Sequence, residues 1–144
     1  MAKIYTLSAY ETSAQEFFSS LRQHQTDLVL DVRLKNTNQL CGFTKRKDLE
    51  FLVPELTGAT YVHDLRFAPE DVLLERYLHH RYSWEDYRDL YQKQMQENDR
   101  PALFKTLYGS YHSICLLGTA TKKRRSHSEA LAELLTTKQV KPGT

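Results

Sequence analysis

The sequence is poor in the residues and motifs on which many common functional classes depend. Its two cysteines, Cys41 and Cys115, cannot build a disulfide framework, and no Cys-x-x-Cys pair occurs. Five glycines among 144 residues include neither a Gly-x-Gly-x-x-Gly turn nor a Walker A loop. A Gly-x-Ser-x-Gly nucleophile elbow is also missing. We therefore expect no cofactor and find no signature of a common enzyme class.

Metal ligands and membrane segments are equally scarce. The sequence has no His-x-x-x-His pair and no clustered thiols, so we expect no metal site. No apolar run approaches the length of a membrane span, and the first residues lack the apolar core of a signal peptide. The net charge is only +2, so an anionic partner has to be argued from local clusters. We expect a cytoplasmic protein without a membrane partner.

What the sequence does contain is an alternation of strand-like and helix-like segments. Strand patterns occur at residues 4–7, 28–32, 59–63 and 112–117. Helical patterns begin at Ser13, whose spacing to Glu16 is that of a capping box, and at Thr44, with an end or interruption near Pro54. Further helical patterns follow at residues 70–80, from residue 83, from residue 101 and from residue 126.

This alternation predicts an α/β fold with a mostly parallel, Rossmann-like sheet of about four strands and helices on both faces. The segment 28–32 supports it, because a strand that is apolar on both faces must be covered on both. We expect one domain over residues 1–135, a flexible tail over 136–144 and the strand order 3-2-1-4. The oligomeric state stays open.

Polar residues follow each predicted strand. Right-handed crossovers bring the carboxyl ends of parallel strands to one edge of the sheet, where open α/β folds bind ligands. The residues expected at that edge are Ser8, Asp31, Arg33, His63, Gly118 and Thr119.

Asp31 and Arg33 lie two apart and so face the same side of a strand. They could present a carboxylate and a guanidinium to a polar or phosphorylated ligand, or they could form a structural pair. His63 and His127 are candidate general acids or bases with Asp31 orienting the ring, which makes all three candidate catalytic residues. The alternatives are that His127 is an exposed helix residue or merely bonds a loop carbonyl, and that His63 is a satisfied histidine at a strand end.

The densest positive charge follows the last predicted strand, at Lys122, Lys123, Arg124 and Arg125. Cations next to a helix start oppose the helix dipole, and a bound anion would reverse that sign. We expect this loop to be mobile without ligand, and Ser126 and Glu129 to cap the last helix as a box. Lys45, within a second basic run, would extend the positive rim if it lies on the same side.

Three segments, taken in the order in which they occur, carry a family resemblance. They are KIYTLSAYETSAQEFFSSLRQHQTDLVLDVRL, GFTKRKDLEFLVPELTGATYVHDLRFAP and YSWEDYRDLY. Together they resemble the bacterial and archaeal family known as domain of unknown function 488, which shares the Asp-Val-Arg end of strand two, Gly-Phe-Thr-Lys, Tyr-x-His and Trp-Glu-x-Tyr. The resemblance covers nearly the whole chain and implies a three-layer α/β sandwich.

The chain departs from that family around its last helix. Many members end strand four with Leu-Leu-Cys and a following glutamate, and begin the last helix with Cys-His-Arg. Here Gly118, Ala120, Ser126 and Ser128 occupy the corresponding places, and only His127 is kept. Thiol redox chemistry or thiolate metal binding at those positions is therefore closed to this chain.

Three functions follow as hypotheses. The first is binding of an anionic ligand, such as phosphate, a nucleotide or a nucleic-acid segment, at the carboxyl edge. The second is a hydrolase or transferase with a histidine general base. The third is a protein-interaction module that uses the tyrosine-rich helices, although the spacing of Trp84, Tyr87, Tyr91 and Met95 is that of a buried helix face.

Overall fold

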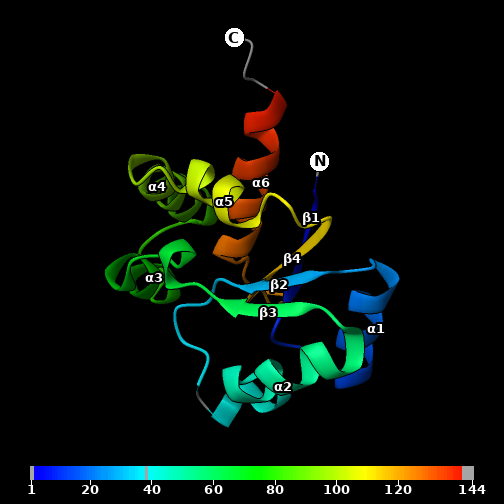
Figure 1. Cartoon of the computed structure of the whole chain (residues 1–144). Helices are drawn as coiled ribbons and strands as arrows, with labels where there is room; N and C mark the ends of the chain where they lie inside the picture. The colour runs from blue at the N-terminus through cyan, green and yellow to red at the C-terminus, as the bar shows by residue number, and fades with distance from the viewer. Residues whose placement is uncertain (1, 38, 141–144) are drawn as a thin grey trace.

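Four parallel strands form one sheet with helices on both faces in the computed structural model, which describes residues 2–37 and 39–140 (Figure 1). The strands are β1 (Lys3–Ser8), β2 (Leu28–Asp31), β3 (Thr60–His63) and β4 (Ser113–Gly118). The helices are α1 (Ala14–Gln23), α2 (Arg46–Thr57), α3 (Asp71–Leu78), α4 (Trp84–Glu97), α5 (Arg100–Tyr108) and α6 (His127–Val140), and the short 3-10 helices are η1 (Gln39–Thr44) and η2 (Leu65–Phe67). The predicted α/β sandwich is confirmed.

Two hydrophobic cores lie on opposite faces of the sheet. Along β2, Leu28 and Leu30 face one core and Val29 faces the other, as the period of two in a strand requires. The first core is shared with α3, α4, α5 and α6, and the second with α1 and α2 (Figure 1). Burial on both faces explains why β2 is apolar at consecutive positions.

The predicted strand order is wrong. The sheet has the order β1-β4-β2-β3, with β4 inserted between β1 and β2. Every residue of β4 is buried, whereas β1 is partly exposed along its whole length. A strand that is apolar on both faces gains most from a central position, because both its faces and both its edges are then covered. Thus β4 takes the centre and β1 the edge.

The chain leaves β4 in a different direction from its two neighbours. The connections after β1 and β2 lead to α1 and α2 on one face, and the connection after β4 leads to α6 on the other (Figure 1). Such a divergence is a topological switch point, the place where open α/β sheets bind ligands. The basic loop follows β4, so the fold puts it at this point.

The helix starts confirm one predicted cap and correct another. At α1 the capping box forms, with Glu16 N donating to Ser13 Oγ at 3.1 Å and Ser13 N to Glu16 Oε1 at 3.2 Å. Thr44 does not cap α2, because its hydroxyl donates to the carbonyl of Ala9 at 3.3 Å and Lys45 takes the N-cap position. Tertiary contact with the β1–α1 loop therefore outcompetes local capping at Thr44.

Proline does not end the second helix. Helix α2 passes through Pro54 to Thr57 and ends at Gly58, whose φ of 75° is left-handed and whose N–H donates to the carbonyl of Pro54. The expected interruption is wrong because the last turn is closed by this glycine C-cap. No helix within residues 2–37 and 39–140 is long and apolar enough to cross a membrane.

The start of α6 is built differently from the predicted capping box. Ser126 Oγ accepts N–H groups from Thr119 at 3.0 Å and from Ser128 at 3.4 Å, so it does cap the helix. The Glu129 carboxylate instead pairs with Arg125 at 3.1 Å, which corrects the reciprocal half of the box. Helix α6 continues beyond residue 135 to Val140, and residues 141–144 lie outside the described part of the chain.

Candidate functional site

A buried ion pair occupies the carboxyl end of β2. Asp31 and Arg33 are 0% and 1% exposed, and two parallel hydrogen bonds join them, from Arg33 Nε to Oδ1 at 2.8 Å and from Nη2 to Oδ2 at 2.7 Å. The Arg33 backbone N–H also donates to Oδ1 at 3.2 Å. The Asp31 carboxylate thus holds both the backbone and the side chain of Arg33, two residues further along the chain.

Further buried groups complete the pair. Asp31 Oδ2 accepts from Asn36 Nδ2 at 3.0 Å and from the Tyr61 hydroxyl, and Arg33 Nη2 donates to the Thr44 carbonyl at 2.7 Å. Burial alone would raise the pKa of Asp31, but the hydrogen bonds and charge of Arg33, with those of Tyr61 and Asn36, outweigh it and lower that pKa. The aspartate is therefore held as a carboxylate for structural reasons.

Both candidate catalytic histidines fasten the segment that follows Asp31. His63 Nε2 lies 2.8 Å from the carbonyl oxygen of Arg33, and His127 Nε2 lies 2.6 Å from that of Val32. A carbonyl only accepts, so each Nε2 carries the hydrogen. Within the described residues, Asp31 takes its hydrogen bonds from Arg33, Asn36 and Tyr61 and from neither histidine.

His127 lies in the core rather than at a surface. It is 2% exposed, its ring packs edge-on against Tyr91, and its Nδ1 is buried without a hydrogen-bond partner among the described residues. Burial lowers the pKa of His127 to about 4, against smaller opposing effects from the Val32 carbonyl and Asp31. A neutral, enclosed imidazole fits the structural alternative that the sequence left open, and no substrate reaches it without rearrangement.

The other predicted edge residues hold the loops in place. Ser8 Oγ donates to the carbonyl of Ala120, and Thr119 N donates to Ser126 Oγ. A Cβ at Gly118 would overlap the side chain of Ser128, so the glycine lets the start of α6 approach the strand. Ser8, Gly118 and Thr119 therefore serve the β4–α6 connection directly.

The basic loop is a closed turn. Thr121 N donates to the Arg124 carbonyl at 2.8 Å and Arg124 N returns to the Thr121 carbonyl at 3.3 Å. Lys122 N donates to the Glu11 carboxylate at 2.7 Å, and the Tyr77 hydroxyl donates to the Arg125 carbonyl at 3.0 Å. Backbone groups thus anchor the loop, while the side chains of Lys122, Lys123 and Arg125 stay exposed. The predicted mobility of this loop remains a prediction.

These cations line a groove with aromatic side chains. The groove holds about 620 Å³ between the loop and the start of α4. Its lining residues, here called the basic groove, are Tyr77, His80, Tyr82, Trp84, Thr121, Lys122, Lys123, Arg124 and Arg125. Among these described residues there are four full positive charges and no carboxylate. The groove therefore combines a positive field with apolar ring surface.

Trp84 lines the basic groove and contacts both a cation and two other aromatic rings. The Arg125 guanidinium lies 4.6 Å from the centroid of its ring, in cation–π contact. Behind Trp84, Tyr77 and Tyr87 stack at 4.0 Å between centroids with planes 5° apart. The predicted burial of the helix face is confirmed for Tyr87, Tyr91 and Met95, whereas Trp84 is half-buried at the groove.

Lys45 takes no part in the basic groove. It lies at the start of α2, against the opposite face of the sheet from α3 and α4, and its ammonium is 4.0 Å from Asp48. A single positive rim through Lys45 is therefore not formed. Within the described residues no group of three His, Cys, Asp or Glu could hold a metal ion.

Sequence reasoning missed Tyr77, His80 and Tyr82 as lining residues and Asn36 and Tyr61 as partners of Asp31. Besides the run of cations, the signal for the groove was the aromatic pair Tyr82 and Trp84 at the start of α4. Nothing in the sequence connected that pair with a loop much later in the chain, because the contact depends on how α3 and α4 return across the sheet.

The buried pair generates a stability prediction. Asp31→Ala should lower the free energy of unfolding by about 3–5 kcal/mol, because it leaves the Arg33 guanidinium buried without its carboxylate. Asp31→Ala combined with Arg33→Met should recover much of this loss. Chemical denaturation measures both. Asp89→Ala, which breaks an exposed pair with Arg88, is the control and should cost at most about 1 kcal/mol. A loss for Asp31→Ala no larger than that of the control would contradict the structural role.

The pKa of His127 gives a stability that depends on pH. The pKa of His127 in the folded chain, about 4, lies below the ordinary 6.5. Between these two pH values the unfolded chain therefore binds a proton at His127 that the folded chain does not bind. The contribution is complete above pH 6.5 and should fall by about 3 kcal/mol as the pH drops to 4. His127→Gln keeps a donor for the Val32 carbonyl and should flatten the profile in this window. The exposed His79→Gln should leave it unchanged, and an unaltered slope in His127→Gln would refute the assignment.

Three comparisons with known proteins gave one match. A search of curated proteins gave no match, and a search of solved structures gave none. A family model matches residues 13–135, which includes β2, β3, β4, the Asp31–Arg33 pair and the basic groove. Its description is "Domain of unknown function DUF488". With most of its length matched, the chain belongs to the DUF488 family.

Proposed function

We propose that this protein binds a phosphate-bearing anion in the basic groove. The observation that carries the proposal is that four cations from one turn, Lys122 to Arg125, line the same groove as three aromatic side chains. The polar residues first expected to contact a ligand at the sheet edge, Asp31 and Arg33, are instead buried against each other. The side chains of Lys122, Lys123 and Arg125, by contrast, are exposed.

Local electrostatics favour an anion at this place. The turn that carries the four cations ends immediately before α6, so these charges lie beside the positive end of a helix dipole. The four cations repel one another, and the helix dipole repels them, so both interactions destabilise the loop without a ligand. A bound phosphate attracts the cations and the dipole alike. The position after the central strand, at the switch point of the sheet, supports the same proposal.

Trp84 makes the proposal directly testable, since it is the single tryptophan of the chain and lies in the basic groove. Pyrophosphate and a nucleoside triphosphate should each change its fluorescence with saturation at low salt. Replacing Lys122, Lys123, Arg124 and Arg125 together by serine should weaken binding by about tenfold or more. The thermal midpoint should barely change, because backbone hydrogen bonds hold the turn.

A control variant removes cations elsewhere. Lys45, Arg46 and Lys47 replaced together by serine should bind as the unaltered protein does, because these side chains lie at the start of α2. Equal weakening by the two variants would mean that only net charge matters. An absence of any fluorescence change with both ligands at low salt would refute the proposal.

A further inference from the structure

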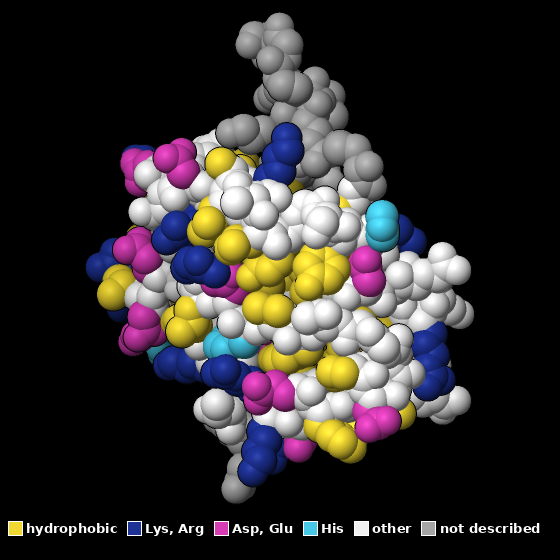
Figure 2. Space-filling model, viewed as in Figure 1, with side chains coloured by type: hydrophobic (Ala, Val, Ile, Leu, Met, Phe, Trp, Pro, Cys, Tyr) yellow, Lys and Arg dark blue, Asp and Glu magenta, His cyan; other side chains and the backbone are white. Residues whose placement is uncertain are grey.

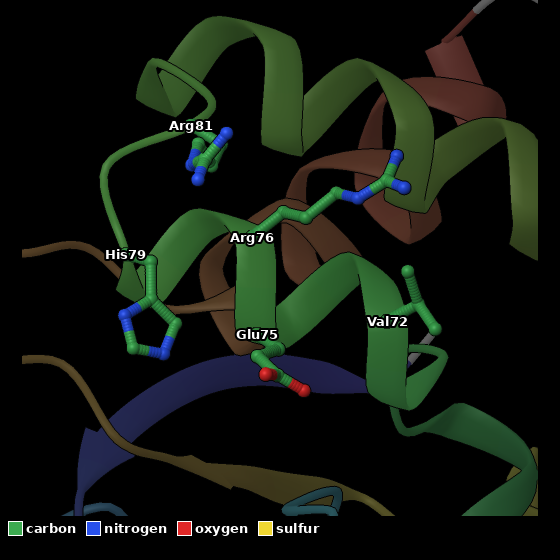
Figure 3. Close-up of a pocket in the computed structure, with 5 residues that line it drawn as sticks. All are labelled: Val72, Glu75, Arg76, His79 and Arg81. Carbon is green, nitrogen blue, oxygen red and sulfur yellow. The ribbon is translucent and has the colours of Figure 1, made fainter.

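A second hollow adjoins the basic groove across the α3–α4 connection. It holds about 340 Å³ and is lined by Val72, Glu75, Arg76, His79 and Arg81. Figure 3 shows Arg76 extending from α3 towards α4, and Arg81 on the connection between the two helices. His79 and Arg81 alternate along the chain with His80 and Tyr82, which line the basic groove. The same short segment therefore forms a wall of both hollows.

A side-chain contact joins the two hollows. Arg76 Nη1 donates to the Tyr82 hydroxyl at 3.3 Å. A cation of the second hollow is therefore hydrogen-bonded to a tyrosine that lines the basic groove. On the face of the molecule seen in Figure 2, Lys and Arg side chains around α3 lie among Asp and Glu side chains. The contact with Tyr82 places Arg76 next to the basic groove, and Arg81 lines the same hollow as Arg76.

The basic groove, Arg76 and Arg81 together form what is here called the positive track. The carboxylates near it limit its extent. Glu75 is the one carboxylate among the described residues lining the second hollow, against two arginines. A third hollow that also reaches Arg76 is lined by the carboxylates Glu70, Asp71 and Glu97 as well as by Lys93. The track therefore ends at Arg76. Cations that line two adjoining hollows suit a ligand that carries several phosphates in sequence.

Aromatic surface lies between the two sets of cations. Trp84 and Tyr82 are both partly exposed, and Trp84 is backed by the stacked rings of Tyr77 and Tyr87. Arg125 covers one face of Trp84, and its own side chain is 57% exposed, so its pair with Glu129 is partly screened by solvent. An unpaired base can displace this guanidinium or stack on it, and either arrangement keeps a cation beside the base.

We infer that the basic groove and the adjoining hollow together bind single-stranded nucleic acid. A base stacks at Trp84, the loop cations contact the phosphates on one side of it, and Arg76 and Arg81 contact those on the other. The inference rests on the proposed function and extends it from a phosphate-bearing anion to a polymer. A paired duplex fits less well, because its bases are stacked on one another and do not reach an aromatic side chain in a groove.

Fluorescence anisotropy with a labelled single strand of about ten nucleotides, within the usual range of site sizes, tests this inference. The variant Arg76→Gln/Arg81→Gln should bind the strand several-fold more weakly. The slope of log K against log salt should become shallower by about 0.7 for each phosphate that the variant no longer neutralises. Its affinity for pyrophosphate, measured by Trp84 fluorescence, should not change. Lys45→Gln/Lys47→Gln is the control of equal charge and should leave both affinities unchanged.

Each outcome separates the inference from the proposed function. Two results would reject binding of a nucleic-acid strand while leaving the anion site intact. One is that pyrophosphate binds but the strand binds no more tightly than pyrophosphate. The other is that Arg76→Gln/Arg81→Gln does not weaken strand binding. Equal affinity for a duplex of the same sequence would overturn base stacking. Binding of neither ligand would overturn both proposals. If the double variant fails to fold, Arg81→Gln alone, at an exposed position, and the salt slope of the unaltered protein decide the question.

Discussion

The buried pair of Asp31 and Arg33 is the interaction on which the carboxyl edge of this sheet depends. It lies at the end of β2, and it draws together Asn36, Tyr61 and the Thr44 carbonyl from segments that the chain reaches later. Burying two charges is costly, and two parallel hydrogen bonds with several further donors and acceptors offset that cost. The pair thus ties the end of β2 to Thr44, just before the start of α2.

Two histidines extend this network to the other strands. His63, at the end of β3, and His127, at the start of α6, each donate to a carbonyl of the segment that follows Asp31. The polar side chains at the strand ends therefore bond mainly to each other and to the backbone of this segment, rather than facing solvent. The ligand site that we propose lies outside them, at the turn before α6, where backbone groups fix the loop and the side chains of Lys122, Lys123 and Arg125 are exposed.

Local patterns predicted most of the local structure, and the errors at Thr44 and in the strand order came where distant contacts decide. The Ser13–Glu16 spacing corresponds to a real capping box, and the doubly apolar segment 28–32 to a strand covered on both faces. Thr44, by contrast, bonds the Ala9 carbonyl instead of capping α2, and β4, which is apolar on both faces, lies inside the sheet while β1 lies at its edge. The candidate site was predictable only in part. The four cations were visible as a run, but that Trp84 lies beside them depends on the return of α4 over the sheet, which no short pattern encodes. Conversely, Asp31 and Arg33 have the spacing of a ligand-binding pair, and only their complete burial reveals the structural role.

If the strand ends are structural, a ligand contacts the groove outside them and leaves them undisturbed. Amide and indole chemical shifts recorded by NMR during titration with a short single strand test this claim most directly. We expect shifts in the amides of residues 121–125 and in the Trp84 indole, while the amides of Asp31, Val32 and Arg33 stay in place. Shifts concentrated at those three residues, with the loop and Trp84 unchanged, would contradict it.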